Sequence, residues 1–225
     1  MGKDDIAKKN KRDKKKRKEA IREIAPLRYL IVCEGEKTEP KYFKGIKDKV
    51  EIKFKEKIDI RKLDLEEFIT LDGTGRNTKS LVDYTLKIKN KANIPYGHIW
   101  CVFDKDSFPQ FNNAIIKAKD NGIKVAWSNE SIELWFLLHF EFLNTGIGRE
   151  DYNKKLDKYF KKYGINGGKY EKNQDDIYKI LSKYGDQKMA IKFAKKLLDE
   201  NKTPTENKPA TTVFKLIEEL EDYLK

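Results

Sequence analysis

A pattern of strand, polar turn and helix recurs four times along this chain. Each repeat opens with a short apolar run, such as the Leu-Arg-Tyr-Leu-Ile-Val-Cys of the first one. Runs of this kind, closed by turn residues, are typical of strands buried in a parallel sheet. The runs occupy residues 27–33, 66–71, 98–103 and 123–127, and the helices expected after them begin near residues 38, 79, 108 and 130. The alternation predicts an α/β fold with a parallel four-stranded sheet and helices on both faces.

The composition divides the 225 residues into three parts. Residues 1–25 form a basic tail, because residues 1–28 hold 12 Lys and Arg against 5 Asp and Glu, a local charge of +7 within the total of +12. The tail has few apolar positions, so we expect it to be disordered or to form a loose helix. Residues 26–145 carry the α/β pattern. Residues 146–225 are rich in Lys and Tyr with helical periodicity, which predicts an α-helical C-terminal subdomain packed on the sheet.

The positive charge favours nucleic acid as the partner, because each phosphate that a protein neutralises releases counterions. A membrane surface or an acidic protein would attract a basic chain too, and the tail could equally be a solubilising end. The longest apolar run, residues 134–140, is interrupted by His139 and is far below the ~20 residues that span a bilayer, so no membrane partner is expected. Cys33 and Cys101 lie in apolar runs, which argues against disulfides and a Cys-rich zinc site and favours the cytoplasm.

Three acidic residues follow directly after predicted strands. Glu34 comes after the first strand, and Asp104 and Asp106 come after the third. The carboxyl ends of parallel strands meet at one edge of a sheet, so these side chains are expected to face one another. Carboxylates are the ligands that Mg²⁺ and Mn²⁺ prefer, and their mutual repulsion is itself an argument for a cation. The alternative is that the acidic residues only terminate strands as turn or cap residues.

These two motifs resemble those of Toprim domains. The Ile-Val-Cys-Glu-Gly of residues 31–35 looks like the Toprim glutamate motif, and the Val-Phe-Asp-Lys-Asp of residues 102–106 looks like the Asp-x-Asp motif. Longer stretches are similar to the RloB-like family, and they lie at residues 32–43, 128–135, 138–141 and 210–213. One departure is that Ser-Phe-Pro, and no glycine, follows Asp106.

The resemblance implies a Toprim nuclease associated with restriction and antiviral loci. It implies that Glu34 acts as general acid or base and that Asp104 and Asp106 are metal ligands.

Two further acidic residues, Glu130 and Glu133, are candidates for another metal ligand or base. Both begin a predicted helix after the fourth strand, where carboxylates also stabilise the helix dipole without any further role. We favour Glu133, because its neighbours Ile132 and Leu134 indicate a position entering the core.

The turn after the second strand is a candidate phosphate-binding site. It is rich in small residues, but Thr78 stands where a P-loop requires glycine, so it is not a Walker motif. Backbone N–H groups at the start of a helix could still hold a phosphate, although an ordinary tight turn explains the sequence equally well. The candidate phosphate or substrate ligands are Lys37, Gly73, Gly75, Arg76 and Lys79.

The sequence therefore predicts a Mg²⁺- or Mn²⁺-dependent phosphodiesterase that acts on DNA or RNA, with a role in antiviral defence. One alternative is a non-catalytic module that binds nucleic acid or an effector through the acidic pocket. Another is a subunit that is active only within a larger defence complex. Protein partners from such a locus and homo-oligomerisation remain compatible with the sequence.

Overall fold

A five-stranded mixed sheet forms the centre of the protein, in the strand order β2-β1-β3-β4-β5. The computed structural model describes residues 3–57, 67–105 and 109–222. The first four strands are parallel, and β5 pairs antiparallel with β4. The strands are β1 (Tyr29–Cys33), β2 (Ile69–Gly73), β3 (His98–Asp104), β4 (Lys124–Asn129) and β5 (Ala210–Thr211). The α/β class is as predicted, whereas the purely parallel sheet of four strands is corrected by β5. The predicted strand start at Glu66 and helix start at Phe108 lie outside the described residues.

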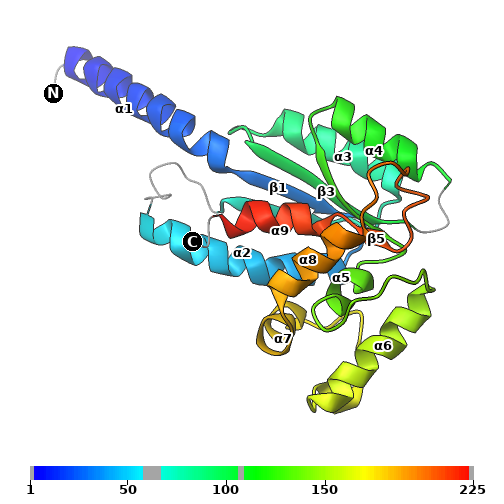
Figure 1. Ribbon diagram of the computed structural model, residues 1–225. Coiled ribbons are helices and arrows are strands. Elements are labelled where there is room, and N and C mark those ends of the chain that lie inside the picture. Colours follow the sequence, from blue (N-terminus) through cyan, green and yellow to red (C-terminus); the bar gives the residue numbers. More distant parts are fainter. Residues whose placement is uncertain (1–2, 58–66, 106–108, 223–225) are drawn as a thin grey trace.

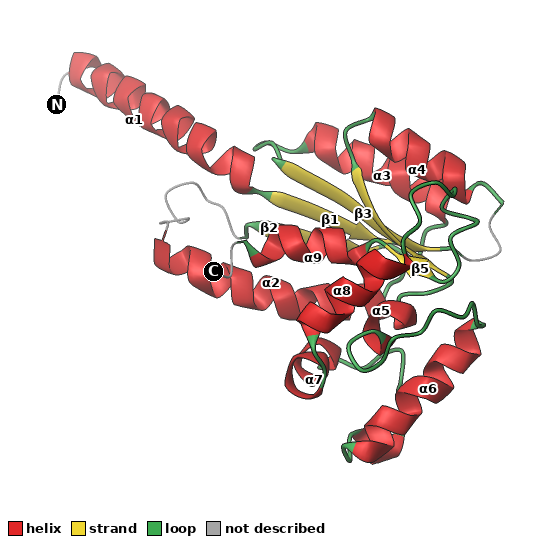
Figure 2. Ribbon diagram, viewed as in Figure 1, coloured by secondary structure: helices red, strands yellow, loops and turns green. Residues whose placement is uncertain are grey.

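Helices cover both faces of this sheet (Figure 1; Figure 2). On one face, Leu30 and Val32 of β1 pack in a cluster with Leu81 and Phe111 from α3 (Thr78–Lys91) and α4 (Phe111–Asp120). On the other face, the alternate β1 residues pack in a larger cluster with α2 (Thr38–Lys57), α5 (Glu133–Leu137) and the C-terminal helices. All five β1 residues are buried, which is why the run is apolar without alternation.

The C-terminal part of the chain is helical, as its periodicity predicts, but its end returns to the sheet. Its helices are α6 (Arg149–Lys162), the short 3-10 turn η3 (Asn166–Gly168), α7 (Ile177–Tyr184), α8 (Gln187–Leu197) and α9 (Val213–Glu221). Between α8 and α9, β5 extends the sheet beside β4, and the Thr212 N–H donates to the Trp127 carbonyl at 2.8 Å. A two-residue strand is too short for any hydrophobic period, so pairing with β4 is what defines it.

The basic N-terminal segment forms helix α1 (Lys3–Ile24), where the sequence allowed either disorder or a loose helix. Lys, Arg, Glu and Ala all have high helix propensity, which accounts for the regular geometry. The helix leads through the 3-10 turn η1 (Ala25–Leu27) into β1 and projects away from the rest of the molecule (Figure 1). Among the helices that the structure describes, none has both the length and the apolar character required to cross a membrane.

Candidate active site

Glu34 lies directly after β1, at the carboxyl edge of the sheet, and hydrogen bonds with β3 and α3 hold it there. Its backbone N–H donates to the Val102 carbonyl at 2.9 Å. Its Oε1 accepts a hydrogen bond of 2.9 Å from the Thr78 hydroxyl, at the start of α3, and its Oε2 accepts one of 3.3 Å from the Asp104 N–H, at the end of β3. The structure therefore brings Glu34 and Asp104 together, and it fixes the orientation of the Glu34 carboxylate.

Asp104 ends β3 with a side chain that is only 14 % exposed. Burial raises the pKa of its carboxyl well above the ordinary value of 3.8, and the charges of Glu39, Glu133 and Glu34 raise it further. The positive charge of Arg149 acts in the opposite direction. Asp106, the other predicted metal ligand of this motif, lies outside the described residues.

Glu39 is a member of this acidic cluster that the sequence did not single out. It stands in the first turn of α2 with 6 % exposure, and its side chain lies over Gly35. A Cβ atom at Gly35 would be 2.2 Å from Oε2 of Glu39, so this glycine leaves space for the carboxylate. Burial raises the pKa of Glu39, as does the charge of Glu133, while backbone N–H groups and Arg149 lower it. A signal was present in the sequence, since Glu39 lies only five residues after Glu34, but an acidic residue in the first turn of a helix is also explained by the helix dipole.

Glu133 begins α5 and is 3 % exposed, which places it within the cluster, and it raises the pKa of both Asp104 and Glu39. Its Oε1 accepts a hydrogen bond of 3.1 Å from the Tyr170 hydroxyl. Glu130 is more exposed and forms an ion pair with Lys208. Of the two candidates, Glu133 is thus the one whose charge bears on Asp104.

Arg149 supplies positive charge from a distant part of the sequence. It is the first residue of α6, and its Nη2 lies 3.6 Å from Oδ2 of Asp104. The same atom donates to the Glu130 carbonyl at 3.4 Å, and the side chain is 40 % exposed. Arg149 therefore neutralises part of the acidic cluster while it remains accessible from solvent.

These residues lie in the part of the chain that matches a known protein family. The model of the RloB-like protein family matches residues 29–220. The chain belongs to the RloB-like family. The match extends from β1 into α9 and includes Glu34, Glu39, Asp104, Glu133 and Arg149, whereas α1 precedes it. Neither a curated protein nor a solved structure matches the chain.

The donor chemistry of this RloB-like site suits a hard divalent cation. Glu34, Glu39, Asp104 and Glu133 offer carboxylate oxygens. Burial is the main cause of the raised pKa of Asp104, and repulsion by the other carboxylates, which a cation would offset, raises it further. Within residues 3–57, 67–105 and 109–222, no three His, Cys, Asp or Glu side chains are arranged to hold a metal ion. The fit is therefore one of donor type and charge, and Asp106 is not part of this test.

The candidate phosphate-binding turn of this RloB-like protein lies beside Glu34. Both the N–H and the hydroxyl of Thr74 donate to the Cys33 carbonyl at 3.1 Å, which fixes the turn against the end of β1. A Cβ atom at Gly73 would be 2.9 Å from the Gly35 carbonyl oxygen, and Gly75 has a φ of 61°. Both glycines are thus explained by backbone packing and conformation.

The three basic candidates around this turn differ in their contacts. The Arg76 guanidinium stacks 4.3 Å above the Tyr84 ring, and Lys37 and Lys79 are exposed. Thr78, which excludes a P-loop, is instead the residue that orients Glu34.

Proposed function

We propose that this RloB-like protein is a Mg²⁺- or Mn²⁺-dependent phosphodiesterase that cuts nucleic acid, using a Toprim-like site at the carboxyl edge of the sheet. The observation that carries the proposal is the doubly hydrogen-bonded Glu34 beside the buried Asp104. An oriented carboxylate next to one with a raised pKa is an arrangement suited to proton transfer and cation binding. The resemblance to Toprim nucleases and the family's association with antiviral loci support a role in defence.

In this proposal Asp104 and Asp106 hold the cation, with Glu34 and Glu133 as further ligands. When bound, the cation supplies polarisation of the scissile phosphate and stabilises negative charge on the leaving oxygen. Glu34 transfers a proton at its carboxylate, whose orientation is fixed by the Thr78 hydroxyl and the Asp104 N–H. Glu39 adds negative charge and strengthens cation binding without needing to contact the substrate.

Arg149 is placed to contact the phosphate itself. Its guanidinium reaches Asp104 from the solvent side with a separation of 3.6 Å, which is longer than a hydrogen bond. A guanidinium binds phosphate oxygens through paired N–H groups. Arg149 would therefore exchange its weak contact with Asp104 for the substrate when a cation neutralises the carboxylates.

The test is a cleavage assay on labelled DNA and RNA, single- and double-stranded, with Mg²⁺ and Mn²⁺ supplied separately. Wild type is compared with Asp104→Asn and Glu34→Gln, and Glu130→Gln is the matched control because Glu130 pairs with Lys208. Cleavage that EDTA, Asp104→Asn and Glu34→Gln each abolish, and that Glu130→Gln preserves, would support the proposal. Binding without turnover, unchanged by any substitution, would instead favour a non-catalytic module, and turnover only with proteins of the same locus would favour a subunit of a larger complex.

A further inference from the structure

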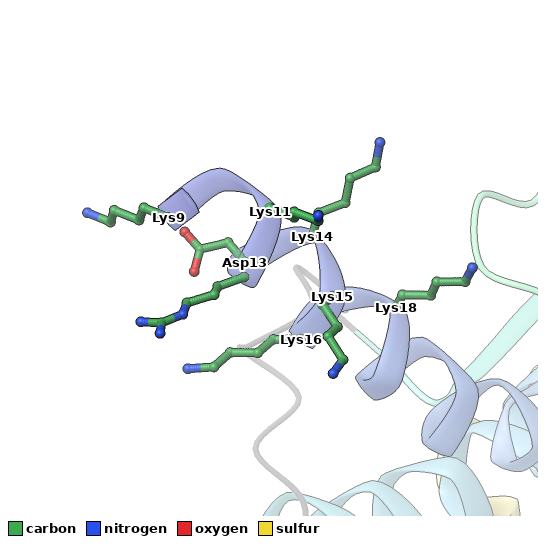
Figure 3. Close-up of a pocket in the computed structure, with 8 residues that line it drawn as sticks. Lys9, Lys11, Asp13, Lys14, Lys15, Lys16 and Lys18 are labelled. Carbon is green, nitrogen blue, oxygen red and sulfur yellow. The ribbon is translucent and has the colours of Figure 1, made fainter. Parts of the chain in front are cut away.

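Helix α1 carries a dense positive charge that the proposed site does not use. Nine of the eleven residues 8–18 are Lys or Arg, and one is Asp, which gives a local charge of +8. The side chains from Lys9 to Glu19 are all exposed. Figure 3 shows several of these lysines extending away from the helix, with Lys9 and Lys18 pointing to opposite sides.

The cations surround the helix and leave no apolar face. Successive residues of an α-helix are about 100° apart, so the nine positions are distributed around nearly the whole circumference. Residues 8–18 contain no apolar side chain. A helix that inserts into a membrane surface or into the apolar groove of a protein partner presents an apolar stripe, so neither of these modes of binding fits this segment.

The charge distribution also works against the helix itself. Lys11 and Lys15 are four residues apart, as are Lys14 and Lys18, and each such like-charged pair costs about 0.2–0.5 kcal/mol. An ion pair of 3.9 Å between Lys15 and Glu19 offsets little of this, because both side chains are exposed. A ligand with negative charge on more than one side would relieve the repulsion and stabilise α1.

We propose that α1 is an arm that enters the major groove of duplex DNA and binds the phosphates on both walls without reading the sequence. The major groove of B-DNA is about 12 Å wide and admits an α-helix, whose diameter is about 10–12 Å. The major groove of A-form RNA is too narrow, which sets duplex DNA apart. This inference rests on the proposed function in taking nucleic acid as the polymer that reaches the site, and it names duplex DNA as the form that the protein engages.

The arm and the site lie at opposite edges of the sheet. Helix α1 leads into the amino end of β1, whereas Glu34 follows its carboxyl end, and α1 projects away from that edge (Figure 1). The five residues of β1 separate the two by about 16 Å, and α1 itself extends about 33 Å further. The arm therefore contributes to affinity and not to the rate of the chemical step.

The test measures binding of the full-length Asp104→Asn protein to a labelled DNA duplex by fluorescence anisotropy at several salt concentrations, without divalent cation. The arm variant replaces Lys14, Lys15, Lys16 and Lys18 with Gln. The matched control replaces four exposed lysines of the C-terminal helices, Lys161, Lys162, Lys183 and Lys188, so that the net charge changes equally.

We expect the arm variant to bind at least tenfold more weakly and to reduce the slope of log K against log salt by about 3–4, while the control stays near the parent protein. Helicity measured by circular dichroism should rise when DNA is added to the parent protein and not to the arm variant. Equal losses in both variants would overturn the proposal, as would tighter binding to single strands, duplex RNA, anionic vesicles or an acidic protein. Because no turnover is measured, failure of the arm is distinguishable from failure of the proposed nuclease.

Discussion

The Thr78 hydroxyl donates a 2.9 Å hydrogen bond to Oε1 of Glu34, across 44 positions of sequence. Thr78 is fully buried in the first turn of α3. The contact therefore connects the start of α3 to the end of β1. The Asp104 N–H holds the other carboxylate oxygen. Glu34 is consequently oriented by two different elements of the fold.

Replacing Thr78 with Val should remove the hydrogen bond with little change of shape. We expect a single-turnover cleavage rate about tenfold lower, since a hydrogen bond to a charged group contributes about 1.5 kcal/mol. Thr78→Ser keeps the hydroxyl and should retain most of the rate. Equal rates for Val and Ser would show that Thr78 does not orient Glu34.

Arg149→Gln should change the pH dependence of cleavage as well as its rate. Arg149 lowers the pKa of both Asp104 and Glu39, so its removal leaves these carboxyls protonated to a higher pH. The acidic limb of the pH–rate profile should therefore move to higher pH. Lys154→Gln, on the exposed surface of the same helix, is the control and should leave the profile unchanged. A rate loss without displacement of this limb would show that Arg149 does not act on the rate through the pKa values of these carboxyls.

Glu39→Gln should stabilise the protein at neutral pH. The raised pKa of Glu39 means that the folded state binds more protons than the unfolded state above the ordinary value of 4.5, so the stability of the wild type falls as pH rises through this range. The variant lacks this penalty, and its advantage in Tm should grow from pH 4 to pH 8. Mg²⁺ should raise the Tm of the wild type more than that of the variant. A Tm difference that is constant with pH would contradict this account.

His139 should make stability fall in acid. It is buried, its Nδ1 donates to the Trp135 carbonyl at 2.9 Å, and burial lowers its pKa from 6.5 to about 4. Between these values the unfolded state binds the proton and the folded state does not, so the contribution is complete above pH 6.5 and is lost as pH falls toward 4. The loss is about 3 kcal/mol. Urea unfolding of His139→Gln should show a flatter pH dependence than the wild type, and parallel curves would refute the assignment.

Asn129 should be essential for the loop that precedes β5. Its Nδ2 donates to the carbonyls of Pro204, Thr205 and Asn207 at 3.2, 3.1 and 2.8 Å. Asn129→Ala leaves these carbonyls without their donor, which should lower the free energy of unfolding by about 2–3 kcal/mol in a urea titration. Asn113→Ala, at an exposed position of α4, should change it by less than about 0.5 kcal/mol. Similar losses in both variants would mean that the loop does not depend on Asn129.

The sequence by itself determined the α/β class and most elements, because each buried strand and each helix leaves a local hydrophobic period. It also placed Glu34 and Asp104 at one edge, since the carboxyl ends of parallel strands must meet there. The apolar neighbours of Glu133 indicated a position entering the core, and Glu133 is buried there, whereas its role as a metal ligand or base stays a prediction.

Only the tertiary structure decided which distant residues complete the cluster. Thr78, Arg149 and Tyr170 reach Glu34, Asp104 and Glu133 through contacts between elements far apart in sequence, and no local period encodes such contacts. The same reason applies to β5, which exists because β4 offers an edge for pairing. Local sequence sets the elements, whereas the charge and orientation of each carboxylate depend on burial and on partners that only the packed fold supplies.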